Sequence, residues 1–309
     1  SFSNIPLVTM PCRCLESKIL FNTEALEKMV YDPEWVLENE EAFWSEYPSQ
    51  RYTRDWSEQV KYPIDYETWR ATVKEWSEVP TKTRHGMDFL KNAERIIEGR
   101  QVFIDKALPH VCSYLPDNAD LDISVHFTAY VPPRAFAMGE IVINMTATYW
   151  NNNPDNILNT MVHELFHVGY SYCENLRGDN DEGPLIDIMR NIHNEGVCTY
   201  IGYMAQNIFP APDEKDYDML NNTKDIHRHH KNVNEILSKL GSITEEELDK
   251  LSWDIGVMER SYYVTGAHMC RVIEEKGSKD ALKRTLIDGP RAFFETYNDL
   301  VTEKEKLFY

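Results

Sequence analysis

No stretch of this 309-residue sequence approaches the roughly 18 consecutive apolar residues that a membrane-spanning helix needs. The first residues, Ser1 to Cys14, also lack a basic segment followed by an apolar one, so no signal peptide is expected there. Basic residues are few, since 32 Lys and Arg stand against 51 Asp and Glu and give a net charge of −19. This acidity disfavours nucleic acids and anionic membrane surfaces as partners.

Cysteines are scarce and irregularly spaced. None of the six forms a C-x-x-C pair, and Cys12 and Cys14 are too close in sequence for an ordinary bridge to each other. In a chain of this length with a helical core, buried free thiols are the usual state of cysteine. We therefore expect free thiols and a reducing, cytoplasmic compartment.

The first part of the chain carries helical signals. Residues 23–115 show apolar side chains at helical spacing between turns that contain Pro. Thr23 is expected to cap a helix that starts at Glu24, and the segment from Tyr66 to Trp76 is amphipathic. Residues 84–114 have the apolar spacing of one long helix.

The hydrophobic period changes after Pro116. The next residues alternate between apolar and polar from Leu121 to Phe127, which predicts a half-buried strand. A second extended pair, residues 135–138 and 141–145, is expected to turn around Gly139. His126 falls on the polar phase of its strand, so we expect it at the surface.

Further helices are expected after this sheet. Asn153, Pro154 and Asp155 predict the start of a helix that runs to about Cys173. Thr244 and Glu247 have the spacing of a capping box. The other expected helices cover residues 185–207, 213–240, 261–276 and 278–288, before an aromatic-rich tail.

This order of elements predicts an α+β fold that is predominantly α-helical. The natural division is an N-terminal helical region, residues 1–115, and a second region, residues 116–309, that carries the small sheet and the later helices. We expect the two regions to pack as one unit.

The most informative motif is His163-Glu164-Leu165-Phe166-His167, an H-E-x-x-H pattern in a helical segment. Residues four apart stack on one helix face, so both imidazoles can reach a single Zn²⁺, and the Glu can take a proton from water there. Apolar neighbours indicate a buried helix, in which two histidines and a Glu are costly unless bonded. The motif therefore predicts a metal site.

Catalytic zinc usually takes three protein ligands. We choose Glu195 as the third, because it lies in an otherwise apolar helix and precedes Gly196, whose small size permits close helix–helix approach. His193 is the second choice and, two residues earlier, points to the opposite side. The full set of donors considered comprises Glu174, Asp179, Asp181, Glu182, Asp187, His193 and Glu195.

This arrangement resembles the gluzincin metallopeptidases, in which a Glu on the next long helix joins the H-E-x-x-H helix. Residues 195–200, Glu-Gly-Val-Cys-Thr-Tyr, are similar to an E-G-x-A-x-Y element of bacterial families of unknown function described as candidate zinc-dependent peptidases. A Pro-containing loop at residues 114–116 and a Gly-containing helix at residues 263–269 also match. The resemblance covers roughly residues 84–300.

The resemblance implies a zincin-like core, with the small sheet beside the H-E-x-x-H helix, and one catalytic zinc. It assigns the metal to His163, His167 and Glu195, and the role of general base to Glu164. The chain differs from the family pattern at two positions. Many gluzincins carry Asp where Thr199 stands, and Cys198 replaces the usual small residue. The strand at 135–138 would be the edge that holds an extended peptide.

Gluzincins commonly add a Tyr or His from a later helix to stabilise the oxyanion. The candidates here are Tyr262, Tyr263 and His268, which flank Gly266. Tyr263 is the first choice, because it lies three residues before the glycine and shares the face of close approach, and His268 is the second. The alternative is that both tyrosines are core aromatics.

Other interpretations stay open at this point. The three histidines His227, His229 and His230 could form a second metal site, although a solvated helix face is much more common. The main motif also suits a zinc hydrolase of a small amide or ester, or a non-catalytic metal-binding protein. The partner expected is a peptide or small amide substrate, with no nucleic acid and no membrane; the oligomeric state is open.

Overall fold

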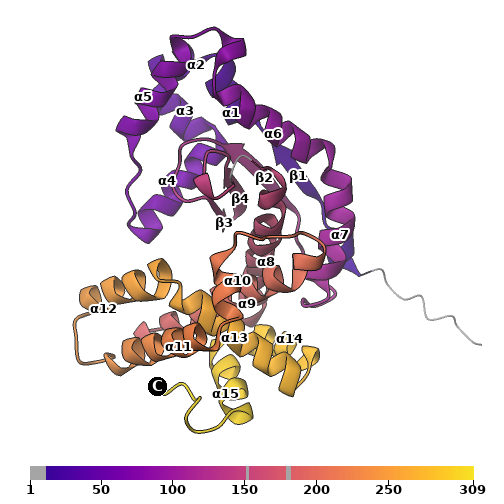
Figure 1. Ribbon diagram of the computed structural model, residues 1–309, viewed down its shortest axis with the longest axis vertical. Coiled ribbons are helices and arrows are strands. Elements are labelled where there is room, and N and C mark those ends of the chain that lie inside the picture. Colours follow the sequence, from indigo (N-terminus) through magenta and orange to yellow (C-terminus); the bar gives the residue numbers. More distant parts are fainter. Residues whose placement is uncertain (1–11, 151–152, 179–181) are drawn as a thin grey trace, which may run out of the picture.

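The computed structural model describes residues 12–150, 153–178 and 182–309. The first part of the chain is helical, and Figure 1 shows its helices curving over one side of a small sheet. Two of them begin with a proline, as the Pro-bearing turns indicate. These helices are α1 (Glu24–Tyr31), α2 (Pro33–Glu38), α3 (Glu40–Glu46), α4 (Pro48–Val60), α5 (Tyr66–Ser77), α6 (Gly86–Glu98) and α7 (Arg100–Cys112).

Two details of this region differ from the sequence prediction. Helix α1 starts at Glu24 as expected, but Thr23 makes no capping hydrogen bond; the side chain of Asn22 accepts one from the Glu24 amide at 2.7 Å instead. The long helix expected over residues 84–114 is two helices, because the backbone leaves helical geometry at Gly99.

The sheet has four strands in the order β1-β2-β4-β3. Strands β1, β2 and β4 are parallel, and β3 pairs antiparallel with β4 in the expected hairpin, which turns at Gly139 with φ 72°. The sequence analysis missed β1. The strands are β1 (Ile19–Asn22), β2 (Ile123–Thr128), β3 (Ala135–Met138) and β4 (Glu140–Asn144).

His126 is not at the surface, so that prediction is wrong. Its side chain is buried and contacts the carboxylate of Glu140, and its ring lies 6.2 Å from that of Tyr52 on α4. On the same strand face, Thr128 donates a hydrogen bond of 2.6 Å to Gln50, also on α4. Helix α4 therefore covers the polar phase of β2, and both faces of this strand are buried.

The remaining helices follow the sheet. Helix α8, which carries the H-E-x-x-H motif, runs four residues further than predicted to Arg177, and Gly178, with φ 62°, caps its C-terminal end. Residues 213–240 form two helices, because Asn221 and Asn222 interrupt them, and the aromatic tail is helix α15. These helices are α8 (Asp155–Arg177), α9 (Pro184–Met204), α10 (Lys215–Leu220), α11 (Thr223–Ser238), α12 (Glu245–Leu251), α13 (Ser261–Lys276), α14 (Lys279–Asp288) and α15 (Pro290–Leu300).

Helix α9 lies at the centre of the second half of the chain. It packs against α8 on one side and against α13 on the other, while α8 also contacts strands β3 and β4. The fold is therefore the predicted predominantly helical α+β class, with the small sheet beside the helix that carries the H-E-x-x-H motif (Figure 1). The capping box at Thr244 and Glu247 is confirmed.

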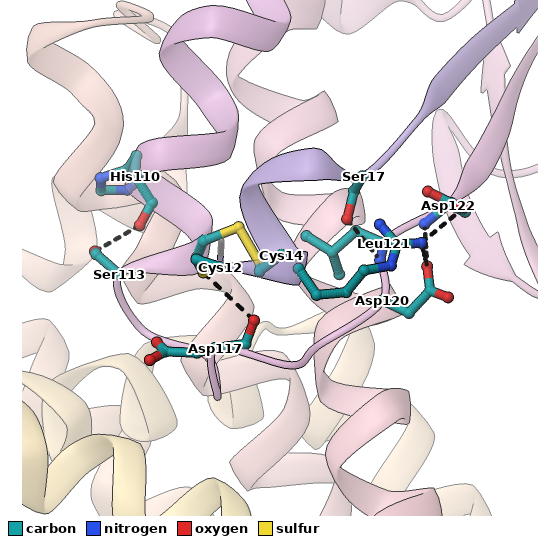
Figure 2. The surroundings of a disulfide bond; sticks show 11 residues. Cys12, Cys14, Ser17, His110, Ser113, Asp117, Asp120, Leu121 and Asp122 are labelled. Atoms are coloured by element: carbon teal, nitrogen blue, oxygen red, sulfur yellow. Dashed lines mark hydrogen bonds and ion pairs between the residues drawn. A yellow bond between two sulfur atoms is a disulfide. The ribbon is translucent and has the colours of Figure 1, made fainter. Parts of the chain in front are cut away.

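A disulfide joins Cys14 to Cys112, so the expectation of free thiols is wrong for these two residues. Figure 2 shows Cys14 close to the loop that leads from α7 toward β2, where Cys12 also donates to the carbonyl of Asp117. The sequence spacing hid this bond because its partners are 98 residues apart. Disulfides are typical of oxidising compartments, so the cysteines no longer support the predicted cytoplasmic location.

Among the residues described, no helix combines the length and the apolar character that crossing a bilayer requires. We propose that the chain consists of two regions, residues 1–115 and 116–309, that pack as one unit. Strand β1 precedes that boundary and pairs with β2 beyond it, with Ile19 opposite Ile123.

Candidate metal centre

Three side chains from two helices converge on one point. His163 and His167 project from the same face of α8, and their Nε2 atoms are 3.1 Å apart. Glu195 on α9 places its Oε2 3.7 Å from Nε2 of His163 and 3.4 Å from Nε2 of His167. All three residues are partly buried. The structure therefore brings together the residues that the sequence analysis chose as metal ligands.

The spacing of these atoms fits a zinc ion. Tetrahedral zinc with bonds of about 2.0–2.2 Å separates its ligand atoms by roughly 3.3–3.5 Å. The three measured separations, 3.1, 3.4 and 3.7 Å, lie around this value. Two imidazole nitrogens and one carboxylate oxygen are also a donor set that zinc commonly uses. The residues present fit the ion.

Helix α9, which carries Glu195, sits very close to α13. A Cβ atom built on Gly196 would lie 2.3 Å from Cα of Gly266, and one built on Gly266 would lie 2.2 Å from the Ile192 carbonyl oxygen. Only glycine fits at both positions. The sequence analysis correctly predicted that Gly196 permits a close approach between helices, but the helix approached is α13 rather than α8.

The neighbours of Glu195 hold it ionised. Burial raises the pKa of its carboxyl group, but His167 and His163 lower it more and keep this pKa well below its ordinary value. An ionised carboxylate is the form that binds a cation.

Asn194 is a site residue that the sequence analysis missed. Its Oδ1 lies 2.9 Å from Nδ1 of His167, and the Sγ of Cys198 lies 3.2 Å from the same nitrogen. An N–H donated from Nδ1 to the amide oxygen leaves the lone pair of His167 on Nε2, toward the convergence point. The only signal in the sequence was its place next to Glu195. Thr199, where many gluzincins have Asp, is buried.

Glu164 follows His163 directly in α8 and is 6% exposed. The chemistry of a general base requires a carboxylate beside the metal that can still meet a water molecule. The position of Glu164 in the motif, next to His163, places its carboxylate beside the ligands. The side chains of His163 and His167 are 16% and 13% exposed, so the centre is open to solvent.

The structure separates the oxyanion candidates. Tyr263 is three residues before Gly266, which packs against Gly196 beside Glu195. Burial raises the pKa of its hydroxyl group, and Glu195 raises it further, so the hydroxyl stays protonated. His268 lies elsewhere, with its ring 6.3 Å from that of Tyr297 and its Nδ1 near Arg271. Tyr262 is buried against Gly256. Of these candidates, Tyr263 is the one that interacts electrostatically with Glu195 and His167.

The other donors considered have different partners. His193 is fully buried, contacts the hydroxyl groups of Tyr170 at 3.1 Å and Thr285 at 3.2 Å, and points away from the centre. Arg190 pairs with both Glu174 and Asp187. Glu182 is exposed, while Asp179 and Asp181 lie outside the described residues.

The histidine cluster on α11 is not one solvated face, which corrects the sequence interpretation. His227 is exposed, but His229 is fully buried and bonds to Ser261 at 2.9 Å. Burial lowers the pKa of His229 to about 4, so it is neutral near pH 7. Within the described part of the chain, the only group with metal-ligand geometry is the one that contains Glu195.

Two surface hollows lie away from this centre. One is among α3, α4 and α5, and the other lies between β1 and α7. Neither is lined by any of the three candidate ligands. The centre is thus recognised by the chemistry of its side chains and not by a surface pocket.

The fold and this donor set define the class: a mostly helical α+β protein with a two-histidine, one-glutamate group on neighbouring helices. Residues 18–306 match the model of the family described as "Putative zinc dependent peptidase (DUF5700)", and the chain belongs to this family. The resemblance to families described as candidate zinc-dependent peptidases is confirmed, and the match begins well before residue 84. No curated protein and no solved structure matches the chain.

Proposed function

We propose that this protein is a zinc-dependent metallopeptidase that hydrolyses peptide bonds, with His163, His167 and Glu195 as ligands of one catalytic ion. The observation that carries the proposal is the convergence of these three side chains at 3.1–3.7 Å, with the acid Glu164 adjacent in the motif. Membership of a family described as zinc dependent supports the choice of metal.

A bound Zn²⁺ would supply a Lewis acid that polarises the scissile carbonyl and acidifies water. Glu164 takes the proton of the attacking water and delivers it to the leaving amine. Tyr263 donates a hydrogen bond to the oxygen that gains negative charge, a role for which its hydroxyl must stay protonated. Asn194 orients His167 so that Nε2 faces the ion.

The substrate would bind along β3. This strand is the outermost of the sheet on the side of α8, so an extended peptide can add to its free edge by main-chain hydrogen bonds. The geometry favours a peptide over a small amide, because a sheet edge beside the centre offers repeated backbone contacts that a small molecule does not use.

Replacement of Glu164 tests the proposed chemistry. We expect Glu164→Gln to abolish cleavage of a mixed peptide library while zinc stays bound, because the amide keeps the shape of the side chain but cannot take a proton. Glu275→Gln, at an exposed position on α13, is the control and should cleave like the wild type. Cleavage by Glu164→Gln at the wild-type rate would overturn the general-base role.

A further inference from the structure

Two arginines from different parts of the chain are each held by a buried carboxylate. Arg134 directly precedes β3 and its Nη2 lies 2.7 Å from Oε2 of Glu214. Arg260 directly precedes α13 and binds Asp216 through Nε at 3.0 Å and Nη2 at 2.7 Å. The arginine side chains are 32% and 31% exposed, but those of Glu214 and Asp216 are only 10% and 5% exposed. The carboxylates are therefore buried more deeply than the arginine side chains that pair with them.

Each guanidinium group also rests on a tyrosine ring. The Cζ atom of Arg134 lies 3.9 Å from the ring centre of Tyr149, and that of Arg260 lies 3.2 Å from the ring centre of Tyr263. The Tyr149 hydroxyl donates to Glu214 at 2.9 Å. A carboxylate on one side and a ring underneath fix the plane of each guanidinium group, as in a preformed binding site.

The two arginine–carboxylate pairs are joined, because the Asp216 amide donates a hydrogen bond of 3.3 Å to Oε1 of Glu214. Tyr263, which lies under Arg260, is three residues before Gly266, and Gly266 packs against Gly196 beside Glu195. Burial and the positive charge of Arg260 lower the pKa of the Arg134 guanidinium, but the carboxylate of Glu214 and its neighbours raise it more, so the net shift is upward. Arg260 in turn interacts with the charge of Glu195. Two guanidinium groups are thus held close together, and each is balanced by its own carboxylate.

Both arginines keep donors to spare. A guanidinium group has five N–H donors, and toward described residues Arg134 uses only Nη2, while Arg260 uses Nε and Nη2. Arg260 also has φ 70°, a left-handed conformation that costs free energy for any residue but glycine. The protein therefore holds this side chain in place at a cost, with part of its binding capacity unused.

We propose that Arg134 and Arg260 form the subsite that binds a carboxylate group of the substrate. This inference rests on the proposed peptidase function and names the substrate class: peptides with a carboxylate near the cleaved bond. Planar guanidinium groups bind carboxylates through paired, charge-assisted hydrogen bonds. A peptide that pairs antiparallel with β3 has its C-terminal end at Arg134, because β3 begins at the next residue. The C-terminal carboxylate is therefore the favoured source, and an Asp or Glu side chain the other.

Binding can be measured without turnover in zinc-loaded Glu164→Gln protein. Matched peptides with a free or an amidated C-terminus are titrated by calorimetry, and a second pair compares Asp with Asn inside an amidated peptide. We expect the free acid to bind about tenfold more tightly than the amide, as one or two charge-assisted bonds imply. A preference for Asp over Asn alone would support the subsite and identify a side chain as its source.

The double variant Arg134→Gln with Glu214→Gln removes both charges at once, so that no buried carboxylate is left alone. It should retain one zinc and reduce the preference for the acid to less than about threefold. The matched control is Arg70→Gln with Glu40→Gln, an arginine–carboxylate pair between α5 and α3, which should keep the full preference.

Equal affinity for acid and amide, and for Asp and Asn, would overturn the proposal, as would a preference that survives in the Arg134 and Glu214 double variant. Failure of the proposed function looks different: the wild type would cleave no peptide, while the binding preference for carboxylates would remain.

Discussion

Asn194 accepts a hydrogen bond from Nδ1 of His167 at 2.9 Å, one residue before the carboxylate of Glu195, which lies 3.4 Å from the other nitrogen of the same ring. One turn of α9 therefore holds the imidazole from one side and meets the metal position from the other. The orientation of His167 and the placement of Glu195 are coupled, since a shift of α9 moves both.

Removal of the Asn194 amide tests this coupling. Asn194→Ala should weaken zinc binding about 10- to 100-fold, because His167 loses the acceptor that fixes its tautomer and ring plane. Zinc affinity is measured by competition with a chromophoric chelator. Asn191→Ala, at an exposed position three residues earlier on α9, should leave the affinity unchanged. Equal affinities for the two variants would mean that Asn194 does not orient the ligand.

The choice of third ligand predicts opposite results for two neighbouring residues. Glu195→Gln should lose zinc, because only two imidazoles remain as strong ligands. His193→Ala should keep zinc but unfold at a lower temperature, since it loses a buried ring that stacks 4.3 Å from Phe293, a change that costs about 2–4 kcal/mol. Metal analysis and thermal denaturation measure both. A zinc-loaded Glu195→Gln beside an empty His193→Ala would make the site a three-histidine one.

The position of Tyr263 predicts an effect on turnover rather than on binding. Tyr263→Phe should lower kcat about 10²-fold or more with little change in KM and full zinc occupancy, because the hydroxyl acts only when the oxyanion forms. Tyr262→Phe removes a hydroxyl from the neighbouring residue and should keep kcat within about twofold. Normal turnover in Tyr263→Phe together with a large loss in His268→Ala would move the role to the histidine.

The helices and the proposed ligands could be predicted from the sequence because their signals are local. His163 and His167 are one turn apart, so their common face follows from helix geometry alone. Glu195 was recognised as a charged residue in an apolar helix next to a glycine. Gly196 is a glycine because its backbone packs directly against Gly266, which leaves no room for a side chain.

What the sequence could not predict depends on contacts between distant segments. The strand at Ile19 exists because β2 lies beside it, and Cys14 lies next to Cys112, 98 residues further along the chain, because the fold brings the two segments together. The alternation of apolar and polar residues shows which residues share a face of a strand, but it does not show what covers that face. His126 was predicted to be exposed for this reason, whereas α4 covers its face of β2.

The arginine pair shows the same limit. Arg134 precedes a strand and Arg260 precedes a helix 126 positions later, so no spacing in the sequence relates them. Their carboxylate partners, Glu214 for Arg134 and Asp216 for Arg260, both lie at the start of the short helix α10. Such a site becomes visible only when the chain is folded.

The most direct test of the account is the zinc content of the purified wild-type protein. The structure offers one set of three ligands among the described residues, so we expect about one zinc per chain after dialysis, or after addition of zinc to protein prepared without it. Fewer than about half an equivalent, with no recovery when zinc is supplied, would contradict the metal centre and the peptidase chemistry built on it.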